Sequence, residues 1–148
     1  MEKYNKIIFA CYDNTAVSPM AEAIMNKVTA NCIDICSRGI VVLFSEPYNP
    51  KIYSVLKKHD VPYVEGSTKS LKNKDFGSDT VVLVPDFMAK KNTYRDFDAA
   101  INVYTIKEFV GLEGDIEEPF GQSEEAYEKL YDELYGLLTM AADKLQLI

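Results

Sequence analysis

The chain has 148 residues, which suits one domain with a core that needs neither disulfides nor a metal to be stable. Its 16 Lys and Arg residues are outnumbered by 23 Asp and Glu, so the net charge is −7. This charge disfavours nucleic acid and anionic membrane surfaces as partners. We therefore expect a single domain over residues 1–148.

Composition also bears on location and on metal binding. No apolar run is long enough to span a membrane, and the segment Met1–Asn5 is too polar for a signal peptide, so we expect a cytoplasmic protein with no membrane partner. The three cysteines, Cys11, Cys32 and Cys36, and the one histidine, His59, form no metal-ligand pattern. We expect no metal and no cofactor, and we interpret Cys32 and Cys36 as small core residues.

The first predicted element is an apolar strand over 6–11, followed by a loop and a helix over about 18–30. Ser18 is placed to cap this helix, and Pro19 fits its first turn. A second strand is predicted over about 32–37. The remaining predicted elements are helices over 50–59 (capped by Asn49) and 87–97, strands over 80–84 and 102–106, an acidic loop over 107–121 and a last helix from Ser123.

The order of these elements indicates the fold class. The strand over 80–84 is continuously apolar and rich in β-branched residues, which is typical of a strand covered on both faces. The last helix carries a long apolar stripe, which predicts a core helix. Strands that alternate with helices predict an α/β fold with a parallel sheet and right-handed crossovers.

The loop after the first strand is the candidate site. An apolar strand ends at Cys11, and six residues lead from it to the helix that begins near Ser18. Such a loop directs backbone N–H groups and a helix N-terminus at one point, which favours oxyanion binding. The same dipoles would favour the thiolate form of a neighbouring cysteine. The pattern predicts a cysteine nucleophile beside an anion-binding loop, at the edge of the sheet where ligands bind.

This stretch resembles the signature of the low-molecular-weight protein tyrosine phosphatases, roughly Val-Cys-x-Gly-Asn-x-Cys-Arg-Ser-Pro-Met-Ala-Glu. By this resemblance Cys11 is the nucleophile and Ser18 hydrogen-bonds its thiolate. A second match, over 103–121, resembles the bacterial members and places Glu118 where the family has its general-acid aspartate. The resemblance covers nearly the whole chain and implies a three-layer α/β/α fold with a four-stranded parallel sheet. The implied anion-binding loop consists of Tyr12, Asp13, Asn14, Thr15, Ala16 and Val17.

Three loop positions depart from the family signature. Asp13 replaces a glycine, Ala16 replaces a cysteine, and Val17 replaces the arginine that binds phosphate. A carboxylate near the thiolate raises the pKa of the thiol and repels a dianionic phosphate. Loss of the guanidinium typically costs about 10³ to 10⁵ in rate. The chain's two arginines are Arg38 and Arg95, of which Arg38 is better placed to lean toward the loop, although a solvated surface position is the simpler interpretation.

The residues that would hold the substrate ring are also altered. By the resemblance one aromatic wall falls at Val41 and the other at Phe120. Valine is not aromatic, so this wall is missing unless Phe44 or Tyr48 takes its place. Tyr12, inside the loop, is placed to crowd or gate the pocket. Selectivity for phosphotyrosine is therefore expected to be altered.

These observations leave three hypotheses for function. In the first, the chain is a pseudophosphatase with weak or absent hydrolysis that still binds an anion or a protein partner. In the second, it is an active hydrolase of phosphotyrosine proteins or small phosphate esters, in which Cys11 attacks phosphorus, Ser18 stabilises the thiolate and Glu118 is the general acid. The third, arsenate reduction, ranks last because residues 84–98 contain no further cysteine.

Overall fold

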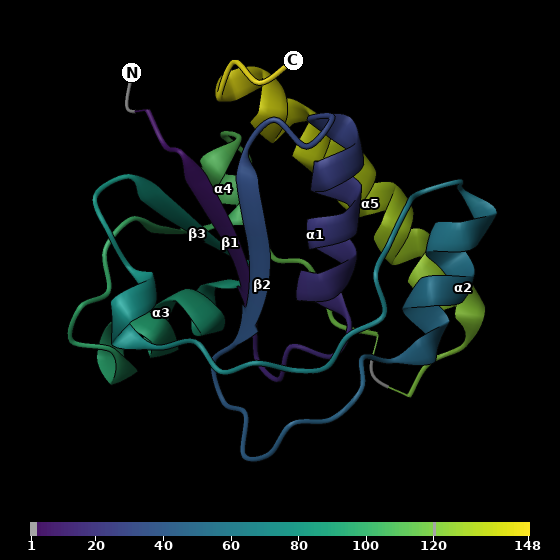
Figure 1. The fold of residues 1–148 in the computed structure, drawn as a ribbon, viewed down its shortest axis with the longest axis horizontal. Coiled ribbons are helices and arrows are strands. Elements are labelled where there is room, and N and C mark those ends of the chain that lie inside the picture. The colour runs from purple at the N-terminus through teal and green to yellow at the C-terminus, as the bar shows by residue number, and fades with distance from the viewer. Residues whose placement is uncertain (1–2, 120) are drawn as a thin grey trace.

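A computed structural model describes residues 3–119 and 121–148. Within this part of the chain, four parallel strands form one sheet in the order β2-β1-β3-β4. The strands are β1 (Lys6–Cys11), β2 (Asp34–Gly39), β3 (Thr80–Val84) and β4 (Val103–Thr105). Helix α3 (Phe87–Asp96) covers one face, and α1 (Val17–Val28), α2 (Pro50–Lys58) and α5 (Glu124–Lys144) gather on the other (Figure 1). The expected three-layer α/β/α fold is confirmed.

Side chains of β1 alternate between the two layers of helices. Ile7, Phe9 and Cys11 pack in the core cluster that contains α1 and α5, whereas Ile8 and Ala10 pack in the cluster that contains part of α3. Both faces of the strand are therefore buried, which explains its continuous apolar sequence. The alternation also directs the Cys11 side chain toward the α1 layer.

The loops that carry the candidate site lie at one end of the molecule. Figure 1 shows the loops after β1 and β2 at the bottom, with both chain ends at the top. In parallel sheets the carboxyl ends of the strands are where ligands bind. None of the helices in the two described ranges is both long and apolar enough to cross a membrane.

Several predicted elements match the structure. β1 and β3 have the predicted bounds, and α2 begins at Pro50, with Asn49 accepting a hydrogen bond from Lys51 N at 3.0 Å. The apolar stripe of α5 is buried against α1 and α2 as expected. Each of these elements was identified by a local signal: an apolar run for β1 and β3, a helix cap for α2 and an apolar stripe for α5.

Two predictions about the elements were wrong. β2 begins at Asp34, so Cys32 lies before the strand and is exposed, while Cys36 is only half-buried. The left-handed Ala30 and Asn31, with φ of 52° and 58°, make the turn after α1 that leaves Cys32 outside the core. A short helix, α4 (Ile106–Phe109), was also missed at the start of the predicted acidic loop.

The helix α4 is stabilised by a reciprocal cap. Glu108 N donates to Thr105 Oγ1 at 3.0 Å, and Thr105 N donates to Glu108 Oε1 at 3.0 Å. This is a capping box, which satisfies two backbone donors at the helix start. Further along the same segment, the buried Ile116 donates its N–H to Pro85 O at 2.8 Å. The acidic segment is thereby fixed beside the end of β3.

Candidate functional site

The Cys11 thiol lies against the hydroxyl of Ser18. Cys11 Sγ is 3.0 Å from Ser18 Oγ, and Asn14 Nδ2 donates to the same hydroxyl at 2.8 Å. Because the amide supplies its own proton, the hydroxyl proton can be donated to the sulfur or to Arg38 O, which lies 3.5 Å from Ser18 Oγ. Ser18 is not the helix cap that the sequence suggested, since α1 begins at Val17 and Ala16 holds the cap position. The Ser18 hydroxyl instead hydrogen-bonds with the Cys11 thiol.

Asn14 holds the loop in place. Its backbone is left-handed, with φ of 65°, a conformation that asparagine tolerates better than most residues. Its Oδ1 accepts from Lys69 N at 2.9 Å, which ties the loop to a distant segment. Gly39 allows a close approach here, because a Cβ at that position would lie 3.0 Å from Asn14 Cβ and 3.1 Å from the carbonyl carbon of Asp13. The loop is therefore rigidly supported.

The carboxylate of Asp13 is turned back on the loop. Its Oδ1 accepts from Thr15 N at 3.0 Å and from Thr15 Oγ1 at 2.7 Å. Thr15 N–H belongs to the set of backbone donors predicted to bind an anion. One of those donors is thus already occupied by a negative group.

Position 17 contributes apolar packing and no charge. Val17 is 1% exposed and Ala16 is 3% exposed, and both belong to the core cluster shared by β1, α1 and α5. Val17 is also the first residue of α1. The place where the family signature has its arginine is filled here by a buried valine.

Glu118 reaches the thiol from a segment more than a hundred residues away. Burial raises the pKa of the Cys11 thiol far above its usual value, the negative charge of Glu118 raises it further, and the hydrogen bond from Ser18 opposes the rise. Burial likewise raises the pKa of Glu118 to about 7, against a hydrogen bond with Cys11, and the charges of Asp13 and Asp86 add to the rise. The structure therefore brings together all three predicted catalytic residues, but in a setting that favours the protonated thiol.

Neither arginine is directed at this thiol. Arg38 Nη1 donates to Ser37 O at 2.7 Å, and its charge acts on Glu22 and Cys36, where it opposes the rise in their pKa values. Arg95 is exposed on α3 and pairs with Asp96, with Nε 2.8 Å from Oδ1. Arg38 therefore does not supply the missing loop charge in this structure.

The predicted walls of the site are only partly aromatic. Val41 and Phe44 line a pocket of about 190 Å³ beside Tyr12, and Tyr12 and Phe44 are largely exposed. Tyr48 lies elsewhere, with its hydroxyl 3.4 Å from Ser37 Oγ. The second predicted wall, Phe120, falls outside the described residues.

Two contributors to the site were missed by sequence reasoning. Asp86 and Asn92, at the start and in the middle of α3, line a pocket of about 460 Å³ together with Tyr12, Glu117 and Glu118. Asp86 lies two residues after the end of β3, at the carboxyl edge of the sheet, and this position is a signal for site residues. The sequence alone placed Asp86 only between the predicted strand over 80–84 and the predicted helix over 87–97.

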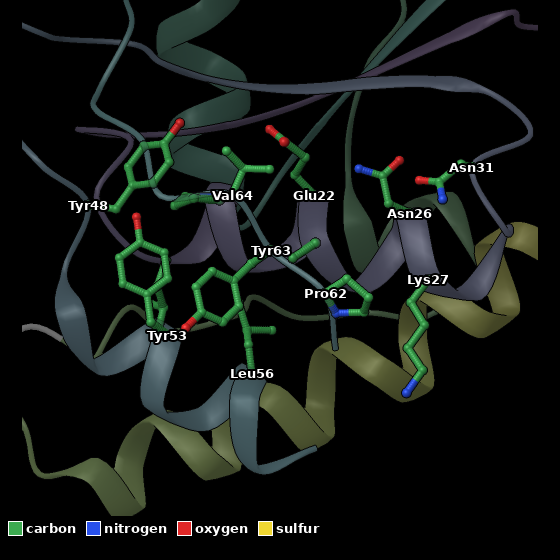
Figure 2. Close-up of a pocket in the computed structure, with 13 residues that line it drawn as sticks. Glu22, Asn26, Lys27, Asn31, Tyr48, Tyr53, Leu56, Pro62, Tyr63 and Val64 are labelled. Atoms are coloured by element: carbon green, nitrogen blue, oxygen red, sulfur yellow. The ribbon is translucent and has the colours of Figure 1, made fainter. Parts of the chain in front are cut away.

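A third pocket, of about 210 Å³, lies between α1, α2 and the segment around Pro62. Figure 2 shows Tyr48, Tyr53 and Tyr63 on one side of it and the amides of Asn26 and Asn31 on the other. The rings of Tyr53 and Tyr63 stack with centroids 4.7 Å apart. None of the residues of the Cys11 loop lines this pocket.

The fold and the site together define a class of protein. A rigid loop carries a cysteine from the end of the first strand of a parallel sheet into a helix, with a serine hydroxyl and a distant carboxyl beside the sulfur. This is the arrangement of a cysteine-dependent phosphatase. Within residues 3–119 and 121–148, no group of three or more His, Cys, Asp or Glu side chains is arranged to hold a metal ion.

Comparison with known proteins identifies the family. The model of the low-molecular-weight phosphotyrosine protein phosphatases matches residues 6–146, so the chain belongs to this family. It is 31% identical over 133 residues to the low-molecular-weight protein-tyrosine-phosphatase PtpB of Staphylococcus haemolyticus, covering 90% of this chain and 94% of the relative. It is 32% identical over 143 residues to a protein-arginine-phosphatase of Geobacillus stearothermophilus, covering 95% and 96%.

Solved structures agree with this assignment. A low-molecular-weight protein tyrosine phosphatase from T. tengcongensis matches with a TM-score of 0.86 and 36% identity, over 95% of this chain and 99% of that one. The YwlE arginine phosphatase from Geobacillus stearothermophilus matches with a TM-score of 0.87 and 31% identity, over 95% and 92%. The chain is thus similar both to tyrosine and to arginine phosphatases of bacteria.

Proposed function

We propose that this family member is a pseudophosphatase: it hydrolyses phosphate monoesters weakly or not at all at neutral pH, and the pocket lined by Tyr12 and Glu118 beside the buried Cys11 serves for binding. The observation that carries the proposal is the electrostatic setting of the sulfur. The charged group that acts on Cys11 is the carboxyl of Glu118, and burial and this charge both disfavour the thiolate. A thiol that stays protonated is a poor nucleophile.

The missing cation adds a second barrier to hydrolysis. Phosphoryl transfer places charge on three equatorial oxygens, and a guanidinium normally holds two of them. Val17 is buried and neutral, and Arg38 is engaged with Ser37. By analogy with other phosphoryl-transfer sites, losing this group costs about 10³ to 10⁵ in rate, or roughly 4 to 7 kcal/mol.

The charges in the pocket favour a partner over an anion as the bound species. The Asp13 carboxylate already accepts a hydrogen bond from the Thr15 N–H. The charges of Asp13 and Asp86 also raise the pKa of Glu118. A dianionic phosphate that approached these carboxylates would meet repulsion in a partly buried, low-dielectric site. Of the two kinds of binding that the sequence leaves open, this argument supports the binding of a partner.

An active phosphatase is the second candidate, and one observation favours it. The Glu118 carboxyl has a pKa raised to about 7, which suits a general acid near neutral pH. In that case Cys11 would attack phosphorus, Ser18 would stabilise the thiolate, and Glu118 would protonate the leaving group. The names of the relatives make phosphotyrosine and phosphoarginine the substrates to test.

A hydrolysis assay separates the two candidates. The rates of hydrolysis of p-nitrophenyl phosphate, a phosphotyrosine peptide and a phosphoarginine peptide are measured between pH 5 and 8, for the wild type and for Cys11→Ser. We expect the two proteins to give the same background rate. Turnover within tenfold of a typical enzymatic rate of about 10 s⁻¹, abolished by Cys11→Ser, would establish the active phosphatase instead.

A further inference from the structure

The pocket of about 210 Å³ between α1 and α2, hereafter the α1–α2 pocket, has the size and the walls of a site for a small ligand. Its lining includes Ile52 and Leu56 of α2, which are each 1% exposed. Tyr53 and Tyr63 also line it, with their rings stacked 4.7 Å apart. A cavity of about 150 Å³ is enough to hold benzene. The α1–α2 pocket therefore has room for a ligand with one aromatic ring and a short polar arm.

Two amide side chains line this pocket without hydrogen-bond partners. Asn26 of α1 is half-buried, Asn31 in the turn after α1 is exposed, and Figure 2 shows both amides opposite the tyrosines. Neither amide side chain makes a hydrogen bond within residues 3–119 and 121–148. A ligand can therefore donate N–H groups to their oxygens without breaking a hydrogen bond of the protein.

Glu22 supplies the pocket with a carboxyl that no cation contacts. In the described part of the chain this half-buried residue forms no salt bridge. Burial raises the pKa of Glu22, and a hydrogen bond with Ser37 and the charges of Arg38 and Lys69 oppose the rise. Because these groups favour the charged form, the carboxylate can pair with a cation brought by a ligand.

Lys27, the other charged residue of the lining, is engaged elsewhere. Its Nζ donates to His59 O at 3.3 Å and to Asp60 O at 3.2 Å, just after the end of α2. Figure 2 shows the Lys27 side chain directed away from Glu22 and from the tyrosines. The space between Glu22 and the tyrosines therefore favours a cation over an anion.

The aromatic side chains favour the same kind of ligand. Burial raises the pKa of Tyr48, and the charge of Glu22 adds to the rise, so the hydroxyl and the carboxylate are close together. Figure 2 shows both groups directed toward the same edge of the pocket. The face of a tyrosine ring attracts an ammonium group that lies within about 6 Å of its centroid. A carboxylate beside aromatic rings is thus complementary to an amine in its protonated form.

From these features we propose that the α1–α2 pocket binds a small organic ammonium ion that carries an aromatic ring. Glu22 and Asn26 lie four residues apart on one face of α1, so one ammonium group can donate to both. The aromatic ring packs on Tyr63 and Leu56. The inference is independent of the proposed function, because none of the residues of the Cys11 loop lines this pocket.

Binding of three matched probes tests this inference. Phenethylamine, 2-phenylethanol and 3-phenylpropanoate share a phenyl ring on a short chain, and at pH 7 they end in a cation, a neutral group and an anion. Titrations of the ¹⁵N-labelled full chain are followed by NMR. We expect phenethylamine to shift the backbone amides of Asn26, Asn31 and Tyr63 with a Kd of about 10⁻³ M or below. The alcohol should bind at least about fivefold more weakly, and the carboxylate more weakly still.

Variants locate the binding and separate charge from ring contact. Glu22→Gln should reduce the affinity for phenethylamine to that for the alcohol, whereas Glu113→Gln, which removes the same charge at an exposed position outside the pocket, should leave it unchanged. Tyr63→Ala should weaken the amine and the alcohol by a similar factor, and Tyr135→Ala, at an exposed tyrosine of α5, should weaken neither. Circular dichroism of each variant checks that it is folded.

Four results would overturn the inference. Equal affinities of the wild type for phenethylamine and 2-phenylethanol would remove the role of the ammonium, and so would binding of 3-phenylpropanoate as tight as that of the amine. A loss in Glu113→Gln as large as in Glu22→Gln would indicate a response to net charge and not a site. Unshifted amides of Asn26, Asn31 and Tyr63 at about 10⁻² M phenethylamine would exclude the pocket. The hydrolysis assay leaves all of these results untouched, so the proposed function and this inference can fail separately.

Discussion

Two carboxyl groups inside this molecule, Glu22 and Glu118, have opposite surroundings. Burial raises the pKa of both. For Glu22, a hydrogen bond with Ser37 and the positive charges of Arg38 and Lys69 oppose the rise, whereas Glu118 lies near the like charges of Asp13 and Asp86. Glu22 lines the pocket of Figure 2, and Glu118 lines the pocket beside Cys11. A partly buried acid without a cation is unfavourable for folding, so it is the stronger indication of function.

The largest effect is expected from restoring a cation to the Cys11 pocket. The double substitution Val17→Arg with Asp13→Gly supplies a guanidinium and frees the Thr15 N–H. We expect hydrolysis of p-nitrophenyl phosphate to rise by about 10³-fold or more over the wild type. If a folded double variant gives no gain, then Glu118 or the altered wall at Val41 also disables the site, and the missing cation is not the main defect.

Removing the charge of Glu118 should stabilise the protein at high pH. A carboxyl whose pKa is raised on folding favours the native state at low pH, and this contribution is lost as pH rises through about 7. Glu118→Gln should therefore raise the free energy of unfolding at pH 8 by up to about 3 kcal/mol and change it little at pH 4. Urea denaturation followed by circular dichroism measures this.

Glu22→Gln is the matched variant for this comparison. Because Ser37, Arg38 and Lys69 already favour the charged form of Glu22, the stabilisation at pH 8 should be clearly smaller than for Glu118→Gln. Equal effects of the two variants would contradict the distinction between the two acids.

Removal of the Ser18 hydroxyl should destabilise the loop. Ser18→Ala leaves the buried Asn14 Nδ2 without the acceptor that lies 2.8 Å away, and this is expected to cost about 1 to 3 kcal/mol. Ser78→Ala, at an exposed serine before β3, should change stability by less than about 0.5 kcal/mol. Thermal or urea unfolding gives both values, and similar costs for the two variants would mean that the Ser18 contacts are weak.

The smallest effect is expected in the rate of thiol alkylation. Cys32 is exposed, whereas Cys11 is buried and its pKa is raised. Iodoacetamide at pH 7.5 should modify Cys11 at least about tenfold more slowly than Cys32, as peptide mass mapping can show. Fastest modification at Cys11 would be the behaviour of an activated nucleophile and would favour the active phosphatase.

Local signals in the sequence predicted much of the fold and half of the site. The bounds of β3 and the cap at Asn49 followed from residue types within a few positions. The pairing of Cys11 with Ser18 followed from the resemblance to the family signature, and the structure places their side chains 3.0 Å apart. The direction of the Arg38 side chain, away from the Cys11 thiol, and the place of Asn92 in the pocket were not predictable in this way. Both depend on how distant segments are arranged in space.

By itself, the sequence determined the parallel α/β fold, the family and the absence of an arginine from the loop, since apolar periodicity and motif spacing are properties of neighbouring residues. Only the tertiary structure determined which charged groups lie near the Cys11 sulfur. Asp13, Asp86 and Glu118 come from three separate segments, and their effect on one another depends on distance and burial in space. The same convergence brings acidic groups from three segments together near the Cys11 thiol.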